Sequence, residues 1–206
     1  MSNILVVKAN NRPDGVSTEM YNVFMENIDQ TKNNVTTFDV FAQEMPYIGQ
    51  DLFNAFAKGT EETDLNEKEA TLMAVRQEAM DKVAAADTIV FAFPMWNLSI
   101  PAALHTFIDY IFQAGFTFSY NPDGSMNQLL KDKKVILLNA RGGIYSGDAS
   151  VMENSVTYME KVFGGMFGMD ITDEIIIEGH NADPSKTDTI VAAGLKKVAD
   201  LAQGLA

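Results

Sequence analysis

The sequence predicts an α/β fold in which helices cover both faces of a five-stranded parallel sheet. Short apolar runs alternate along the chain with longer segments in which apolar residues recur at helical spacing. Apolar strands joined by helices are typical of a parallel sheet that is buried on both faces. The 206 residues suffice for one sizeable domain and are few for two. We therefore expect a single domain over residues 1–206.

The expected strands coincide with the apolar runs, and the expected helices lie between and after them. Strands are predicted over 3–8, 35–41, 88–93, 134–140 and 171–178, and helices over 17–30, 66–86, 101–114, 153–167 and 187–204. Ser17 or Thr18 can cap the first helix. Asn66 and Glu69 have the spacing of a capping box, and Pro101 suits a first helical turn. Right-handed crossovers then give a doubly wound sheet of order 2-1-3-4-5, the flavodoxin-like arrangement.

Two stretches exceed this minimal fold. Residues 42–63 form a long excursion after the second strand. Phe116, Phe118 and Tyr120 alternate with polar residues and precede the turn sequence Asn-Pro-Asp-Gly, which predicts an added hairpin. A hairpin outside the sheet cannot fully bury this aromatic face within its own subunit, so we expect it at an interface between two copies.

The composition excludes several classes of partner and chemistry. The formal net charge is −13, with 15 Lys and Arg against 28 Asp and Glu, and such a surface repels nucleic acid and anionic membranes. The chain has no cysteine, which excludes disulfides and thiolate chemistry. Neither a signal-peptide pattern nor an apolar run of membrane-spanning length is present, so a cytoplasmic protein without membrane contact is expected. No metal-ligating or hydrolytic constellation is apparent, and no metal site is predicted.

Ligands of a doubly wound sheet bind beyond the carboxyl ends of the strands, at the point where the strand order reverses. The first loop there, residues 9–16, leads into Ser17, Thr18 and Glu19 at a helix N-terminus. Unpaired N–H groups and the helix dipole make such a terminus a phosphate site. The loop lacks a G-x-G-x-x-G motif and a Walker lysine. It therefore favours one terminal phosphate, as in FMN, over NAD or ATP. The alternative is that Ser17 only caps the helix.

Two further loops meet at the same point. In residues 94–101, two prolines stiffen the backbone, and Met95 and Trp96 offer surface to a flat ring. The alternative is that Trp96 packs under the hairpin. After the fourth strand, Gly142 and Gly143 would let the backbone approach a ligand, and Arg141 could face a pyrimidine ring. The alternative is an ordinary glycine turn.

The two histidines of the chain are weaker candidates. His105 is expected on the packed side of its helix, where a histidine is more often structural than catalytic. His180 is expected in a loop near the rim of the site.

The loop sequences resemble those of the FMN-dependent NADH-azoreductases and NADH:quinone oxidoreductases. The matching segments are VVKANNRP, FPMWNLSIPAALHTFIDY, LLNARGG and IIIEGHN, together with the hairpin GFTFSYNPDG. The resemblance implies that FMN is bound by residues of the three loops. These are Asn10, Ser17, Thr18 and Glu19 at the phosphate and ribityl end, Pro94, Met95, Trp96, Asn97 and Leu98 along the isoalloxazine, and Ala140, Arg141, Gly142, Gly143 and Tyr145 at its pyrimidine side.

The resemblance also implies a homodimer with FMN at the subunit interface, in which Phe116, Phe118 and Tyr120 would line the substrate pocket of the partner. The function that follows is transfer of electrons from NADH or NADPH through FMN to quinones and aromatic azo compounds, by a ping-pong mechanism. The flavin carries the chemistry, so no catalytic side chain is assigned. The alternatives are a flavodoxin-type electron carrier without its own substrate, and a regulatory or scaffold protein without flavin.

Overall fold

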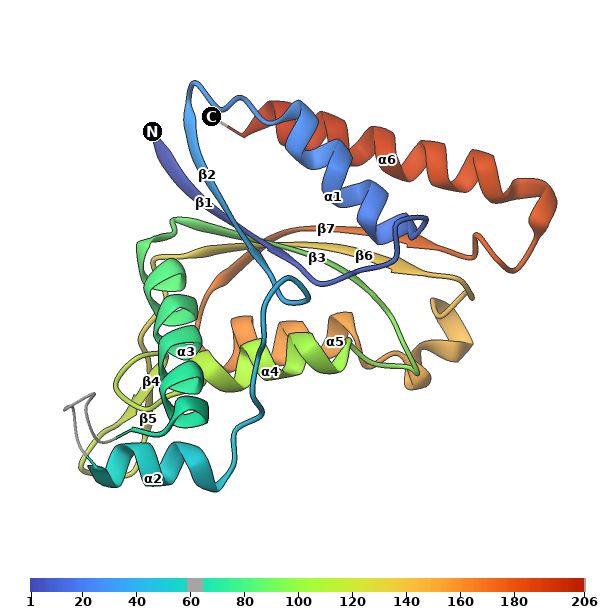
Figure 1. Ribbon diagram of the computed structural model, residues 1–206. Helices are drawn as coiled ribbons and strands as arrows, with labels where there is room; N and C mark the ends of the chain where they lie inside the picture. Colours follow the sequence, from blue (N-terminus) through green and yellow to red (C-terminus); the bar gives the residue numbers. More distant parts are fainter. Residues whose placement is uncertain (59–64, 206) are drawn as a thin grey trace.

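The computed structural model describes residues 1–58 and 65–205. Its main sheet has five parallel strands in the order β2-β1-β3-β6-β7 (Figure 1). The strands are β1 (Ser2–Lys8), β2 (Asn33–Asp39), β3 (Thr88–Pro94), β6 (Lys134–Arg141) and β7 (Asp170–Glu178). Counted within this sheet alone, the order is 2-1-3-4-5, which confirms the flavodoxin-like prediction.

Helices cover both faces of the sheet. On one face lie α1 (Val16–Asn27) and α6 (Thr187–Gly204), and on the other lie α3 (Glu67–Ala85), α4 (Ala102–Ile111) and α5 (Val156–Met159) (Figure 1). A shorter helix, α2 (Gln50–Lys58), precedes α3. The remaining helical turns are η2 (Gly147–Met152), η3 (Glu160–Met166) and η4 (Pro184–Lys186). None of the helices in the described ranges is long and apolar enough to span a membrane.

The two faces have separate hydrophobic cores, because side chains of a strand alternate between them. Ile4 and Val6 of β1 pack with α1 and α6, while Leu5 and Val7 pack with α3 and α4 on the opposite face. All seven residues of β3 are buried. Burial on both faces explains why the central strands are continuous apolar runs in the sequence.

The helix ends confirm one predicted cap and correct another. Asn66 accepts a hydrogen bond from the Glu69 N–H, and the Glu69 carboxylate accepts one from the Asn66 N–H, both at 2.9 Å, so the capping box is confirmed. Gly15 is the N-cap of α1, and no side chain caps that helix. The prediction that Ser17 or Thr18 caps it is therefore wrong.

The hairpin is confirmed, and its aromatic face is only partly exposed. β4 (Phe118–Tyr120) pairs antiparallel with β5 (Met126–Gln128). Phe116 lies in a turn before the strand rather than in it. Phe118 is buried within its own subunit, 5.5 Å from the Phe112 ring, whereas Tyr120 is 65% exposed. The aromatic face is thus not fully buried within the subunit, as expected, and most of its exposed surface belongs to Tyr120. Of the predicted excursion 42–63, residues 59–63 lie outside the described residues.

Candidate functional site

The three predicted loops meet at the carboxyl ends of the strands. They border a cavity of about 220 Å³, and the loop after β7 closes it from a fourth side. We call it the loop cavity. Its lining consists of Asn10, Arg12, Gly15, Val16, Ser17, Pro94, Met95, Trp96, Ala140, Gly142, His180 and Asn181.

A buried polar pair lies at the α1 end of the loop cavity. Asn10 Nδ2 donates to Ser17 Oγ, and the two residues are 2% and 1% exposed. The Arg12 N–H donates to Asn10 Oδ1 at 2.9 Å. A Cβ on Gly15 would lie 2.6 Å from Asn10 Nδ2, so this close approach requires glycine at the helix N-cap. The pair thus turns two polar side chains toward the N-terminus of α1 rather than serving as a cap.

The two neighbouring predicted residues, Thr18 and Glu19, do not belong to the lining of the loop cavity. Thr18 Oγ1 donates to the Arg12 carbonyl at 2.7 Å and so ties the loop to the helix. Glu19 is exposed and does not line the loop cavity.

The loop after β3 turns through two residues of positive φ. Trp96 and Ser99 exchange backbone hydrogen bonds of 2.9 and 3.0 Å, and between them Asn97 has φ 51° and Leu98 has φ 68°. Such values are uncommon for residues other than glycine and cost backbone energy. Both side chains are exposed. Trp96 lies 6.2 Å from the Phe41 ring, so it packs against the loop after β2 and not under the hairpin.

Arg141 lies in a buried ion-pair cluster next to the loop cavity. Its guanidinium is 3.1 Å from the Glu178 carboxylate and 3.5 Å from that of Glu153. Burial acts to raise the pKa of Glu153, but hydrogen bonds from Ser155, Val156 and Thr157 outweigh it and hold the pKa at about 2. Arg141 does not line the loop cavity, and its place opposite a pyrimidine ring stays a prediction.

The paired glycines are explained by contacts within the chain. A Cβ on Gly142 would lie 2.5 Å from Asn181 Nδ2, and one on Gly143 would lie 3.0 Å from the Tyr145 ring. Asn181 therefore occupies the position that a Cβ on Gly142 would take, and Gly142 and Asn181 both line the loop cavity. Contacts within the chain thus favour glycine at both positions, and the approach of this backbone to a ligand stays a prediction.

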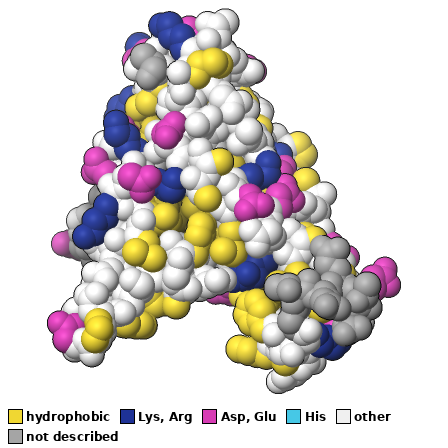
Figure 2. Space-filling view, turned by 90° about the vertical axis from the view of Figure 1, so that its left-hand side faces the viewer, with side chains coloured by type: hydrophobic (Ala, Val, Ile, Leu, Met, Phe, Trp, Pro, Cys, Tyr) yellow, Lys and Arg dark blue, Asp and Glu magenta, His cyan; other side chains and the backbone are white. Residues whose placement is uncertain are grey.

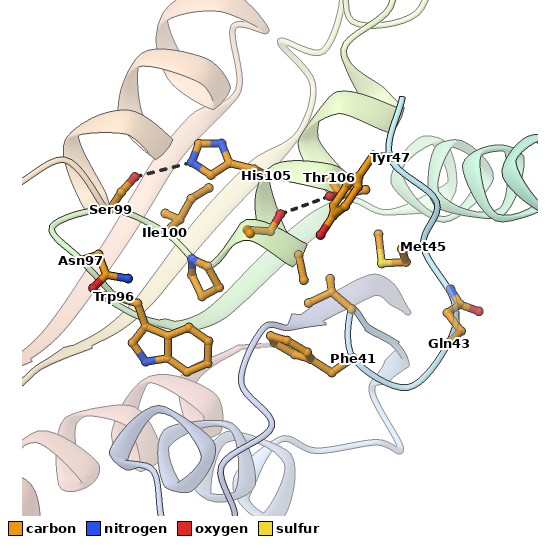
Figure 3. A pocket seen from close by; sticks show the side chains of 14 residues that line it. Phe41, Gln43, Met45, Tyr47, Trp96, Asn97, Ser99, Ile100, His105 and Thr106 are labelled. Atoms are coloured by element: carbon orange, nitrogen blue, oxygen red, sulfur yellow. Dashed lines mark hydrogen bonds between the residues drawn. The ribbon is translucent and has the colours of Figure 1, made fainter. Parts of the chain in front are cut away.

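A second, larger cavity of about 620 Å³ adjoins this region and shares Trp96 with the first. We call it the open cavity. Tyr47 and Met45 approach it from the loop after β2, and Trp96, Ser99 and His105 from the opposite side (Figure 3). Ser99 Oγ is 3.5 Å from His105 Nε2. His105 was expected to have a structural role on the packed side of its helix, but it lines this cavity.

Sequence reasoning missed most residues of the open cavity and misjudged His180. Only the unusual length of the excursion after β2 indicated that Met45 and Tyr47 belong to a site. His180 is 9% exposed and lines the loop cavity instead of lying at its rim. Of the described residues, Phe116, Phe118 and Tyr120 line neither cavity of their own subunit.

Comparisons with known proteins agree with this architecture. A family model described as flavodoxin-like fold matches residues 2–201. FMN-dependent NADH:quinone oxidoreductase 4 of Bacillus cereus is 44% identical over 207 residues, which cover 98% of this chain and 99% of that protein. FMN-dependent NADH:quinone oxidoreductase 1 of Bacillus subtilis is 39% identical with the same coverage.

Two solved structures are similar over nearly the whole chain. The crystal structure of azoreductase AzrA has a TM-score of 0.86 and 43% identity. That of an azoreductase from Bacillus anthracis has a TM-score of 0.86 and 42% identity, and each match covers 98% of this chain and 99% of the other. The chain therefore belongs to the flavodoxin-like family of FMN-dependent NADH:quinone oxidoreductases and azoreductases.

Proposed function

We propose that this chain is an FMN-dependent oxidoreductase that transfers electrons from NADH to quinones and aromatic azo compounds. The observation that carries the proposal is the pair of adjoining cavities at the strand ends. One has a polar lining at a helix N-terminus, the other has an aromatic lining, and Trp96 borders both. The names of relatives that are 44% identical over the whole chain support the same activity.

The loop cavity fits the phosphate arm of FMN. α1 is 12 residues long, and its first turn directs N–H groups and the positive end of the dipole toward the cavity. Asn10, Arg12 and Ser17 add polar groups there. His180 Nδ1 is buried without a hydrogen-bond partner among the described residues, as expected where a polar ligand belongs. These local groups would hold the phosphate against a net charge of −13.

The remaining site residues follow from this placement. We place the isoalloxazine along Pro94–Leu98, with its pyrimidine side toward Ala140–Gly143. Arg141 and Tyr145 would act through the loop, because Arg141 pairs with Glu153 and Glu178, and the Tyr145 N–H donates to Glu178 at 2.9 Å. Thr18 and Glu19 would belong to the supporting helix end and not to the contact surface.

When bound, the flavin supplies reversible two-electron chemistry. The chain would contribute position and a water-poor surface, through Phe41, Met45, Trp96 and Ile100 of the open cavity. NADH and the acceptor would occupy this one opening in turn, which gives a ping-pong mechanism. No acid or base from the protein is needed for it. The same opening would admit NADPH, which we keep as the second candidate donor.

The open cavity favours an enzyme over a flavodoxin-type carrier. A carrier passes electrons to another protein through an exposed flavin edge and needs no pocket for a small acceptor. Here the excursion after β2 places Gln43, Met45 and Tyr47 across the open cavity from the loop after β3, and the two segments together border such a pocket (Figure 3).

Steady-state kinetics test the proposal. Purified protein with FMN should oxidise NADH continuously when 1,4-naphthoquinone is present, and double-reciprocal plots at several quinone concentrations should be parallel. Bound FMN without turnover would identify a carrier. Intersecting plots would refute the ping-pong order, and a chain that binds no flavin would be a scaffold. Replacing NADH with NADPH in the same assay decides the donor.

We further propose that the enzyme is a homodimer. Apolar side chains gather in the hollow of the face that carries α2, α3 and the hairpin (Figure 2). On these elements Phe53 is 61% exposed, Phe56 49% and Tyr120 65%. Exposed apolar surface on this scale usually marks an interface. A second copy related by a twofold axis would cover it and bring the hairpin aromatics toward the site of its partner.

A further inference from the structure

The open cavity has two walls, and one of them lacks regular secondary structure. The loop after β3 and the first turns of α4 form one wall, and Gln43, Met45 and Tyr47 form the other, which we call the second wall (Figure 3). Residues 43–48 belong to no helix or strand. Within the described part of the chain, they take part in a single hydrogen bond. The position of the second wall therefore depends on that bond and on side-chain packing.

Tyr110 of α4 supplies this hydrogen bond. Its hydroxyl donates to the Pro46 carbonyl at 2.6 Å, and both residues are buried. Burial raises the pKa of Tyr110, and the carboxylates of Asp109 and Glu44 act in the same direction. The hydroxyl thus keeps its proton at neutral pH and remains a donor. Away from water, such a bond holds its two partners at a defined distance.

Pro46 transmits this constraint to its neighbours. Its ring fixes φ at Pro46 and restricts the preceding residue, Met45, to extended conformations. Met45 and Tyr47, on either side of the anchored residue, both line the open cavity. A single held carbonyl therefore fixes the backbone of two residues that line the cavity.

Both walls of the open cavity depend on α4. The first turns of this helix line the cavity through Ala102, Ala103, His105 and Thr106, whereas Tyr110 lies in its last turn and holds the second wall. The helix is a rigid connection between these two positions. The separation of the walls is thus set within one element and by one hydroxyl group.

We propose that Tyr110 is a positioning residue for the electron acceptor, and that its hydroxyl holds Met45 and Tyr47 at the separation from α4 that the acceptor requires. This inference rests on the proposed function, which places the acceptor in the open cavity. Tyr110 lines neither cavity, so it acts through the second wall and not by contact with the acceptor or the flavin. Without the hydroxyl, binding of the acceptor would include the entropic cost of ordering this wall.

Tyr110→Phe tests the inference, with Tyr21→Phe as the matched control. Each variant removes one hydroxyl, and that of Tyr21 lies 3.3 Å from Thr37 Oγ1 in a residue that lines neither cavity. In steady-state assays of the full chain with FMN, NADH and 1,4-naphthoquinone, the KM for the quinone should rise about three- to tenfold in Tyr110→Phe. Because the wall is ordered again once the quinone is bound, kcat and the Kd for FMN should change less than about twofold. Tyr21→Phe should match the wild type in all three quantities.

Pro46→Gly provides a second test, because it leaves the carbonyl in place and frees the backbone that the hydroxyl holds. The KM for the quinone should rise in this variant too, and it decides the question if thermal unfolding shows that Tyr110→Phe is not folded. An unchanged KM in folded Tyr110→Phe would refute the role of Tyr110, and so would an equal rise in the KM for the quinone and the Kd for FMN. A wild-type chain that binds FMN without turning over the quinone would instead refute the proposed function, on which the inference rests.

Discussion

At the scale of single residues, the buried pair of Asn10 and Ser17 bears on the role of Ser17. The sequence suggested two roles for Ser17, a helix cap or a phosphate ligand. In the structure it caps nothing, and its hydroxyl accepts from Asn10 next to the loop cavity. A hydroxyl that accepts one hydrogen bond still has its own proton to donate. The structure therefore favours the ligand role over the cap.

Replacing Ser17 with alanine should weaken FMN binding. A hydrogen bond to a charged group contributes about 1.5–3 kcal/mol, so the Kd should rise roughly ten- to a hundredfold. Riboflavin should bind the wild-type chain much more weakly than FMN does, and Ser17→Ala should narrow that difference. Titration of both flavins by calorimetry measures this. Equal affinity of the wild type for the two flavins would contradict the phosphate assignment.

Glu153 should make the protein acid-sensitive. Its pKa is lowered from 4.5 to about 2 in the folded state, so its ionised form stabilises the fold fully above pH 4.5. This contribution, on the order of 3 kcal/mol, is lost as the pH falls from about 4.5 toward 2. Urea unfolding from pH 7 to pH 3 should show the decline.

Glu153→Gln is the matched variant for this effect. It should be destabilised at pH 7, because Arg141 loses a buried partner, and its stability should fall less steeply with acid. Glu178 also has a lowered pKa and contributes in the same direction. The difference in unfolding free energy between wild type and variant, followed with pH, therefore isolates the contribution of Glu153. If the unfolding free energy of both proteins falls equally steeply with acid, Glu153 is not responsible.

At the scale of elements, the connection between β3 and α4 has an unusual backbone conformation. β3 and α4 are joined by a turn in which Asn97 and Leu98 both have positive φ. Asparagine adopts this region with little cost, whereas leucine does so at a cost of about 1–2 kcal/mol. Strain of this kind persists where the surrounding structure demands one backbone shape, and here the turn lies beside both cavities.

Leu98→Gly should therefore stabilise the protein by up to about 1 kcal/mol, since glycine adopts positive φ freely but loses more chain entropy on folding. Asn97→Gly should change the stability less, because asparagine already tolerates this conformation. Thermal unfolding of the two variants provides the comparison. A lower melting temperature for Leu98→Gly would mean that the leucine side chain, and not its backbone strain, governs the stability of the turn.

At the scale of the whole molecule, the exposed apolar face links assembly to activity. Phe118 belongs to the interior of its own subunit, so the dimer prediction must rest on other hairpin residues. Tyr120 and Met126 are 65% and 37% exposed and lie opposite one another in β4 and β5. Truncation of an aromatic side chain in the core of an interface often weakens the binding free energy by about 2–4 kcal/mol.

The double variant Tyr120→Ser and Met126→Ser should raise the dimer dissociation constant at least about tenfold. Quinone reduction should fall as monomer accumulates, if the partner completes the site. Sedimentation across a dilution series, with activity measured on the same samples, tests both effects. Phe53→Ser on α2 removes an exposed aromatic from another part of the same face, and it should also raise the dissociation constant. Dissociation in that variant alone would place the interface on α2, and an active wild-type monomer would remove the dimer from the mechanism.

Local patterns were sufficient to predict the strands, the capping box, the hairpin turn and the meeting point of the loops. The strands and the capping box depend on neighbouring residues, because strands buried on both faces must be apolar throughout and a capping box spans four positions. The meeting point of the loops follows from the strand order of a doubly wound sheet. Folding was needed to bring Asn181 against Gly142, to pair Arg141 with Glu153 and Glu178, and to bury Phe118 and His180. These contacts join residues from separate elements. Their energies depend on distances that only the packed chain defines, and no local spacing encodes them.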